Sequence, residues 1–228
     1  MALRRARRIF GTVLALATGL VLAFYVLAVA ELILLRWINP PTTTVQVQRR
    51  LEAWIHRRPY TKRYRFVPLN RISPHLQHAV VSAEDGRFYD HHGIDWKEVQ
   101  QVIDQDIEDG HLGRGGSTIT QQLIKNLFLT TNRSFIRKGV EFTLAPLAER
   151  VLSKRRILEL YLNVIEWGPG VYGAESAARL WYAVSAAQVN REQAARLAAL
   201  IPAPLRRKPA RMTWYSGEIE RRMAQRGW

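Results

Sequence analysis

The apolar run near the N-terminus constrains the fold of this chain more than any other feature. From Ile9 to Ala30 no charged residue occurs, and about 20 apolar residues suffice to cross a bilayer as a helix. The run is preceded by a basic cluster, Arg4, Arg5, Arg7 and Arg8. Because basic flanks stay in the cytoplasm, the pattern predicts an anchor that places everything after Trp37 across the membrane.

A cleaved signal peptide is the alternative, since Ala28-Val29-Ala30 has the small residues of a cleavage site. The apolar region of a signal peptide is typically about 7–15 residues, which is shorter than this run, and apolar residues continue through 32–35. The uncleaved anchor is therefore favoured. Prolines 40 and 41 then indicate an extended linker. The expected division is a cytoplasmic basic tail at 1–8, a transmembrane anchor at 9–35, a linker at 36–44 and a folded domain at 45–228.

The charge balance indicates an anionic partner. Lys and Arg number 34 against 19 Asp and Glu, which suits lipid head groups, a phosphorylated substrate or nucleic acid. A basic domain outside the cytoplasmic membrane seldom meets nucleic acid, so we expect a phosphorylated lipid instead. The chain has no cysteine, which excludes disulfides and thiolate metal sites.

Helix signals dominate the rest of the chain and predict a mainly α domain. Ser73 precedes a proline at a first helical position, and that helix should end near Glu84-Asp85. Asp95 followed by Glu98 has the form of a capping box. Further helices are expected to begin at Ser117, Ser134 and Ser153.

Two details of this pattern are less regular. Pro146 lies inside the helix that begins at Ser134, so we expect a kink or break around Ala145. Strand signals are few, with short candidates only at 44–47 and 65–68.

Two acids at a helix end are the first candidate for chemistry. Glu84 and Asp85 are followed by Phe88, His91 and Gly93. Taken alone, acids at a helix end are usually solvated surface groups.

A glycine-rich turn at 113–116 leads into the helix expected at Ser117. Unpaired N–H groups and the helix dipole at such a start favour an anion. Gln122 and Lys125 share one face of this helix with Ser117. An ordinary capped helix with a solvated lysine is the alternative. A nucleotide P-loop is excluded, because its Gly-Lys-Ser/Thr core is missing.

Arg133, Arg137 and Glu141 recur every four residues and therefore share a helix face. A surface ion pair of this kind contributes only about 0–1 kcal/mol to stability. The functional alternative is a second carboxylate among cations that hold a phosphate group.

Four segments occur in one order along the chain: Glu84-Asp85-x-x-Phe88-x-x-His91-x-Gly93, Gly115-Gly116-Ser117-Thr118-Ile119-x-Gln121-Gln122-x-x-Lys125-Asn126, Arg137-Lys138-x-x-Glu141 and Lys154-x-x-Ile157-Leu158-Glu159-x-Tyr161-Leu162-Asn163. This series resembles glycosyltransferase family 51, in particular its monofunctional biosynthetic peptidoglycan transglycosylases. The likeness covers about 70–204. The chain departs from the family at Pro146 and at 181–184, where Trp-Tyr-Ala-Val replaces a frequent Tyr-Phe-Gly-Lys.

The resemblance implies a lysozyme-like domain behind one transmembrane helix, which polymerises glycan strands. The growing glycan on undecaprenyl pyrophosphate would be the donor and lipid II the acceptor, with inversion to a β-1,4 bond. Glu84 would be the general base, with Glu141 as a second catalytic carboxylate. The expected substrate-binding residues are Ser117, Thr118, Gln122, Lys125, Arg133 and Arg137. Structural support is expected from Asp85, Phe88, His91, Tyr161 and Asn163.

The same resemblance sets the remaining expectations. No organic cofactor is expected, and Glu141 would either orient the arginines or hold a divalent ion, Mg²⁺ or Mn²⁺. The enzyme would sit in the bacterial inner membrane with a periplasmic domain, among membrane lipids and cell-wall synthesis or division proteins, and away from nucleic acid. The absence of Ser-x-x-Lys and Lys-Thr-Gly motifs predicts no transpeptidase activity.

Two other functions fit part of the pattern. A muralytic hydrolase would also use two carboxylates around a sugar, but it has no use for cations beside Glu141. A non-catalytic scaffold anchored by its helix would tolerate replacement of Glu84.

Overall fold

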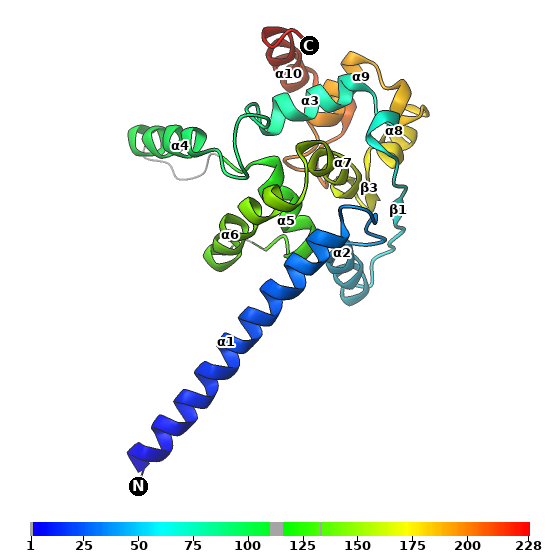
Figure 1. Cartoon of the computed structure of the whole chain (residues 1–228). Coiled ribbons are helices and arrows are strands. Elements are labelled where there is room, and N and C mark those ends of the chain that lie inside the picture. The colour runs from blue at the N-terminus through cyan, green and yellow to red at the C-terminus, as the bar shows by residue number, and fades with distance from the viewer. Residues whose placement is uncertain (1, 110–115, 133) are drawn as a thin grey trace.

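The computed structural model describes residues 2–109, 116–132 and 134–228. It confirms the expected mainly α fold with one apolar N-terminal helix (Figure 1). The elements in chain order are α1 (Ala2–Leu34), α2 (Thr44–Ile55), β1 (Arg63–Tyr64), η1 (Leu69–Arg71), α3 (Pro74–Glu84), α4 (Trp96–Asp109), α5 (Ile119–Phe128), α6 (Phe135–Val151), α7 (Lys154–Val164), β2 (Glu166–Gly168), β3 (Val171–Tyr172), α8 (Ala174–Tyr182), η2 (Ala186–Gln188), α9 (Arg191–Ala198), η3 (Pro209–Arg211) and α10 (Thr213–Gln225).

Helix α1 projects from the domain as a long rod with the N-terminus at its free end (Figure 1). Within the described residues it is the one helix long and apolar enough to cross a membrane, over Arg7–Leu34, as judged by length and composition. Its last turns belong to the domain, because Ala28 and Leu32 are buried in the hydrophobic core. The Tyr25 hydroxyl also lies 2.5 Å from the Thr143 hydroxyl of α6.

Arg156 of α7 fastens the end of α1 to the domain. Its guanidinium donates to the carbonyl oxygens of Leu35 at 2.8 Å and Ile38 at 3.0 Å. It also donates to the Asn39 side chain at 2.8 Å and pairs with Glu159. A cation at a helix C-terminus satisfies carbonyl groups that have no partner inside the helix. Arg156 therefore fixes the turn after α1 to α7, in addition to the packing of Ala28 and Leu32 in the core.

Replacing Arg156 with alanine is expected to loosen this junction and to lower the free energy of unfolding by about 1.5–3 kcal/mol, the range for charge-assisted hydrogen bonds. Because the chain lacks cysteine, spin labels can be attached at two introduced cysteines, Leu20→Cys and Leu180→Cys. The distance distribution between them should broaden in R156A. The neighbouring exposed Arg155 provides the control, and an equal broadening in R155A would contradict the assignment.

Helix α7 forms the centre of the domain. Its apolar side chains are fully or almost fully buried, namely Ile157, Leu158, Leu160, Tyr161, Leu162 and Val164. Helix α5 packs on both α6 and α7, while α3 packs on α9 and α10. Helix α5 is thereby fixed against the buried α7, whereas α3 is held by α9 and α10.

The strands differ from those expected. Residues 44–47 begin α2 instead of forming a strand, because the Thr43 side chain caps the helix and Val45 is buried. The strand expected at 65–68 lies earlier, at Arg63–Tyr64, and pairs parallel with β3. Strand β2 pairs antiparallel on the other side of β3, so the order is β1-β3-β2.

Most of the expected helix starts are confirmed. Ser134 and Ser153 cap α6 and α7, and Asp95 accepts a hydrogen bond from the Glu98 backbone N–H. Helix α3 ends at Glu84 as expected. The cap expected at Ser117 is wrong by one residue, since Thr118 forms a capping box with Gln121 at the start of α5.

Of the kink or break expected near Ala145, the break does not occur, since α6 continues through Pro146 to Val151. Gly93 lies directly on this part of the helix with a φ of +92°. A Cβ atom there would come within 2.7 Å of the Ala145 carbonyl carbon. Only glycine allows this contact, which joins the loop after α3 to α6.

Ala183 is the residue where the departure at 181–184 has a structural effect. It follows α8 with a φ of 56°, in the left-handed region that glycine adopts most easily. Replacing Ala183 with glycine is therefore expected to stabilise the domain by about 1 kcal/mol, which a urea unfolding curve can measure. Ala186, the first residue of η2, does not have a positive φ. It serves as the control, and A186G should not stabilise.

Candidate active site

A cavity of about 650 Å³ brings the motif residues together. It lies among α2, the end of α3, the polar face of α5, the start of α6, strand β2 and the segment at 201–204. Its polar lining consists of Arg49, Glu84, Ser117, Gln122, Lys125, Asn126, Thr131, Arg137, Lys138, Glu141, Glu166 and Tyr215. Most of the cations gather on the side formed by α5 and α6.

Glu84 is the last residue of α3 and lies against α5 in the lining of the cavity. Its carboxylate accepts a 2.7 Å hydrogen bond from the Gln122 amide. The Tyr161 hydroxyl donates in turn to Gln122 at 2.9 Å and so holds the orientation of the amide. Burial raises the pKa of Glu84, while Gln122 and Lys125 act in the opposite direction. A carboxylate of raised pKa in a cleft is suited to accept a proton.

The hydrogen bond from Gln122 lowers the pKa of Glu84, so replacing Gln122 with methionine is expected to raise that pKa further. A base works only when ionised, and catalytic activity is therefore lost as pH falls through its pKa. The acid limb of the pH–rate profile should move to higher pH in Q122M. Tyr161→Phe should produce a smaller shift in the same direction, because the amide remains. An unchanged acid limb in Q122M would separate Gln122 from the protonation of Glu84.

Glu141 is the centre of a cation cluster on α5 and α6. It is only 2% exposed, and its two carboxylate oxygens accept from Arg137 and from Lys138, the latter at 3.1 Å. Lys138 also donates to the Ser117 hydroxyl at 2.7 Å. Lys125 lies nearby, and burial lowers its pKa while Glu141 raises it. The Arg137–Glu141 contact is therefore part of a mostly buried network rather than a surface ion pair.

The cations outnumber the carboxylate in this cluster. Lys125, Arg137 and Lys138 surround the single charge of Glu141, so the cluster keeps a positive balance that suits a polyanion. Arg133, which was expected to join it, lies outside the described residues.

The start of α5 differs from the expected anion site. The Asp85 carboxylate accepts the Ile119 backbone N–H at 2.9 Å, and thus supplies the anion at this helix end. Thr118 is buried, accepts from the Gln121 N–H and donates to the Gly93 carbonyl at 2.7 Å. Its hydroxyl is used inside the protein and Thr118 does not line the cavity, so its expected contact with the substrate stays a prediction.

Comparison with known proteins identifies the family of this chain. The family model for transglycosylases matches residues 48–226. The chain belongs to the transglycosylase family. It is therefore a glycosyltransferase, and the resemblance seen in the sequence motifs is confirmed.

Curated relatives of this transglycosylase match it over most of its length. It is 44% identical over 226 residues to the biosynthetic peptidoglycan transglycosylase of Thiobacillus denitrificans, across 98% of this chain and 93% of that protein. Proteins of the same description from Dechloromonas aromatica and Nitrosospira multiformis are 45% and 49% identical. These two matches cover 82% and 72% of this chain, and 80% and 72% of the relatives.

The expected supporting residues of the transglycosylase lie in the loop that follows Glu84 and on α7. His91 Nε2 lies 2.9 Å from Asp85, next to the Asp85–Ile119 bond. Phe88 is fully buried. Asn163 bonds both the N–H and the carbonyl of Val67, each at 2.9 Å.

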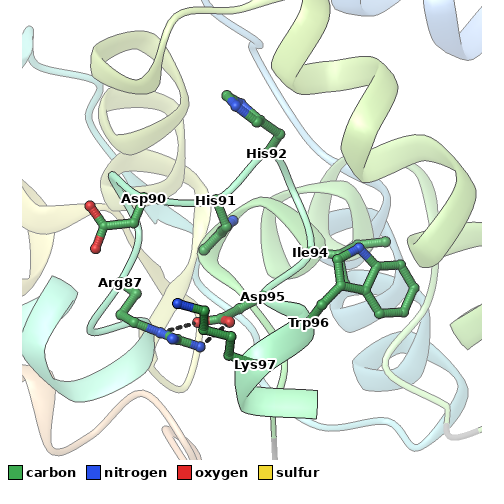
Figure 2. Close-up of a pocket in the computed structure, with 8 residues that line it drawn as sticks. All are labelled: Arg87, Asp90, His91, His92, Ile94, Asp95, Trp96 and Lys97. Carbon is green, nitrogen blue, oxygen red and sulfur yellow. Dashed lines mark hydrogen bonds and ion pairs between the residues drawn. The ribbon is translucent and has the colours of Figure 1, made fainter. Parts of the chain in front are cut away.

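A second pocket of about 510 Å³ is lined by residues between Arg87 and Lys97, in the loop from α3 to the start of α4, and is drawn in Figure 2. Asp85, His91 and Asp95 offer ligand atoms within 4.8 Å of one another. However, Arg87 already pairs with Asp95, as Figure 2 shows, and Asp85 is bonded to His91 and Ile119. The transglycosylase uses these acids to hold its own loop, and a metal ion would have to displace Arg87.

Several residues that line the transglycosylase cavity were missed in the sequence. Lys138 was part of a motif but had no role, although its spacing of three from Glu141 is a usable signal. Arg49 and Glu166 form a 3.0 Å ion pair on the opposite wall. They lie 117 residues apart, so no local pattern could have joined them.

Proposed function

We propose that this transglycosylase polymerises the glycan strands of peptidoglycan from lipid II. The observation that supports this most directly is the arrangement of the cavity. One partly buried carboxylate, Glu84, shares the same 650 Å³ space with a cluster of Lys125, Arg137 and Lys138. A base and a cation cluster that line one cavity suit the displacement of a pyrophosphate by a hydroxyl group.

In the proposed reaction, Glu84 accepts the proton of the 4-hydroxyl of the acceptor's N-acetylglucosamine. That oxygen attacks the anomeric carbon of the donor, and the bond from this carbon to the pyrophosphate oxygen breaks. The products are a β-1,4 bond, with inversion, and undecaprenyl pyrophosphate. Lys125, Arg137 and Lys138 stabilise the negative charge that develops on the leaving group.

Glu141 has two proposed roles, to orient the cations or to hold a divalent ion. Both of its oxygens already bond to Arg137 and Lys138. A divalent ion would enter a cluster that is positive without it, so the orienting role is better supported by the contacts. We expect polymerisation activity to persist in the presence of a chelator. An increase in activity on addition of Mg²⁺ or Mn²⁺ would instead favour the role of Glu141 as an ion ligand.

We place the enzyme in the bacterial inner membrane as a single-pass protein. The arginines before α1 would remain in the cytoplasm and the domain would lie in the periplasm. Lipid II and the nascent glycan, both held in that membrane by their lipid, are the proposed substrates. Cell-wall synthesis or division proteins are the proposed partners, and no peptide cross-linking activity is expected.

One assay tests the function directly. Purified full-length protein is incubated with lipid II, and polymer is followed on a gel with and without divalent ions and chelator. Polymer formation is the expected result. If no polymer forms while finished glycan strands are digested, the enzyme is a hydrolase and the cation cluster has another use.

A further inference from the structure

Helix α2 has two unlike faces, and its inner face is bonded to the wall of the catalytic cavity. The Thr44 hydroxyl donates to the Leu127 carbonyl at the end of α5, at 2.7 Å. Gln48 makes two hydrogen bonds with Thr131, of 2.9 and 2.8 Å. Together with the Arg49–Glu166 ion pair on the same helix, these contacts leave α2 little freedom to move independently of the cavity.

The outer face of α2 is apolar and unpartnered within the described part of the chain. Val47, Leu51, Trp54 and Ile55 are between 45% and 76% exposed. Their spacing of four, three and one residues places them in one stripe along the helix. Four large apolar side chains in a contiguous stripe indicate a surface that is covered in the working state of the protein.

The position and charge of α2 indicate what covers this stripe. Figure 1 shows α2 at the end of the domain from which α1 leaves. Trp37 and Ile38, at the exit of α1, are likewise exposed. Beside the stripe and just after it lie exposed arginines, Arg50, Arg57 and Arg58. Tryptophan and arginine beside an apolar helical stripe are typical of helices that lie in a bilayer interface.

We propose that α2 lies in the interface of the bilayer that α1 crosses, with its apolar stripe among the upper acyl chains and its arginines on anionic head groups. This inference rests on the membrane anchorage in the proposed function. Because the inner face of α2 is bonded to the cavity wall, contact with the bilayer would hold the cavity beside the lipid-linked substrate. The chain would then have two membrane contacts. Helix α1 would span the bilayer, and α2 would orient the domain on its surface.

The first experiment measures burial of the stripe without reference to catalysis. The full chain carries Leu51→Cys with an environment-sensitive fluorophore and is reconstituted in phosphatidylglycerol–phosphatidylcholine vesicles. Acyl chains brominated near the head group should quench the label about twofold or more. Trp214→Cys, on an exposed position of α10, is the matched control and should not be quenched. An unquenched label at 51 in vesicles would overturn the proposal.

The second experiment tests the contribution of charge and excludes a protein partner. Arg57→Glu combined with Arg58→Glu should reduce quenching by about half in vesicles rich in phosphatidylglycerol, and much less in phosphatidylcholine alone. Quenching that is lost as protein density in the bilayer rises would assign the stripe to a second copy of this chain and overturn the lipid assignment. If the label is buried as expected but lipid II is not polymerised, the proposed function fails while this inference stands.

Discussion

Replacing Glu84 with glutamine is expected to abolish polymerisation while leaving the fold intact. The amide keeps the shape of the side chain and its contact with Gln122, but it cannot accept the acceptor's proton. Loss of a general base typically costs about 10²–10⁴-fold in rate. The measurement is the turnover rate at saturating lipid II, with circular dichroism to verify the fold.

Glu192→Gln provides the matched control, because that carboxylate is exposed on α9 and lies outside the cavity. It should polymerise at the wild-type rate. If E84Q retains more than about a tenth of the wild-type turnover, Glu84 is not the base, since a general base contributes at least about 10²-fold.

Arg137→Ala and Glu141→Gln are expected to lower turnover strongly, and their effects should not add. Removing one preorganised donor to a developing negative charge costs about 10²–10³-fold. Arg137 and Glu141 are bonded to each other, so the double variant should be little worse than either single variant. Binding of a phosphoglycolipid that mimics the donor should weaken in R137A. Additive losses would show that the two residues act independently.

The burial of Glu141 also changes the expected stability of these variants. An exposed ion pair would contribute about 0–1 kcal/mol, whereas Glu141 is only 2% exposed and bonded to two cations. E141Q leaves Arg137 and Lys138 without their anion, so we expect a loss of about 1–3 kcal/mol in the free energy of unfolding. A urea unfolding curve beside the activity data separates the two effects.

Helices were largely predictable in this chain because their start signals are local. A serine or aspartate cap and the apolar spacing that follows it lie within one or two turns, as at Ser134 and Ser153. Errors arose where a tertiary contact decided the outcome. The β-branched alternation at 44–47 favours a strand, but burial of Val45 and the Thr43 cap make it a helix.

The site was predictable to the extent that its residues belong to sequence motifs. Glu84, Gln122, Lys125 and Glu141 share one cavity, although no spacing rule connects residues from α3, α5 and α6. The family resemblance made that connection. Arg49, Glu166 and Tyr215 could not be found in this way, because they reach the cavity only through long-range packing.

Helix α6 carries both the cation cluster and the contact to the membrane helix. Thr143, which lies 2.5 Å from Tyr25 of α1, is only two residues from Glu141. Because α6 is continuous from Phe135 to Val151, a movement of α1 at Thr143 is passed directly to the cation cluster at Glu141. If α1 crosses a bilayer as proposed, the tilt of α1 and the height of the cations above the head groups should change together when the bilayer thickness changes.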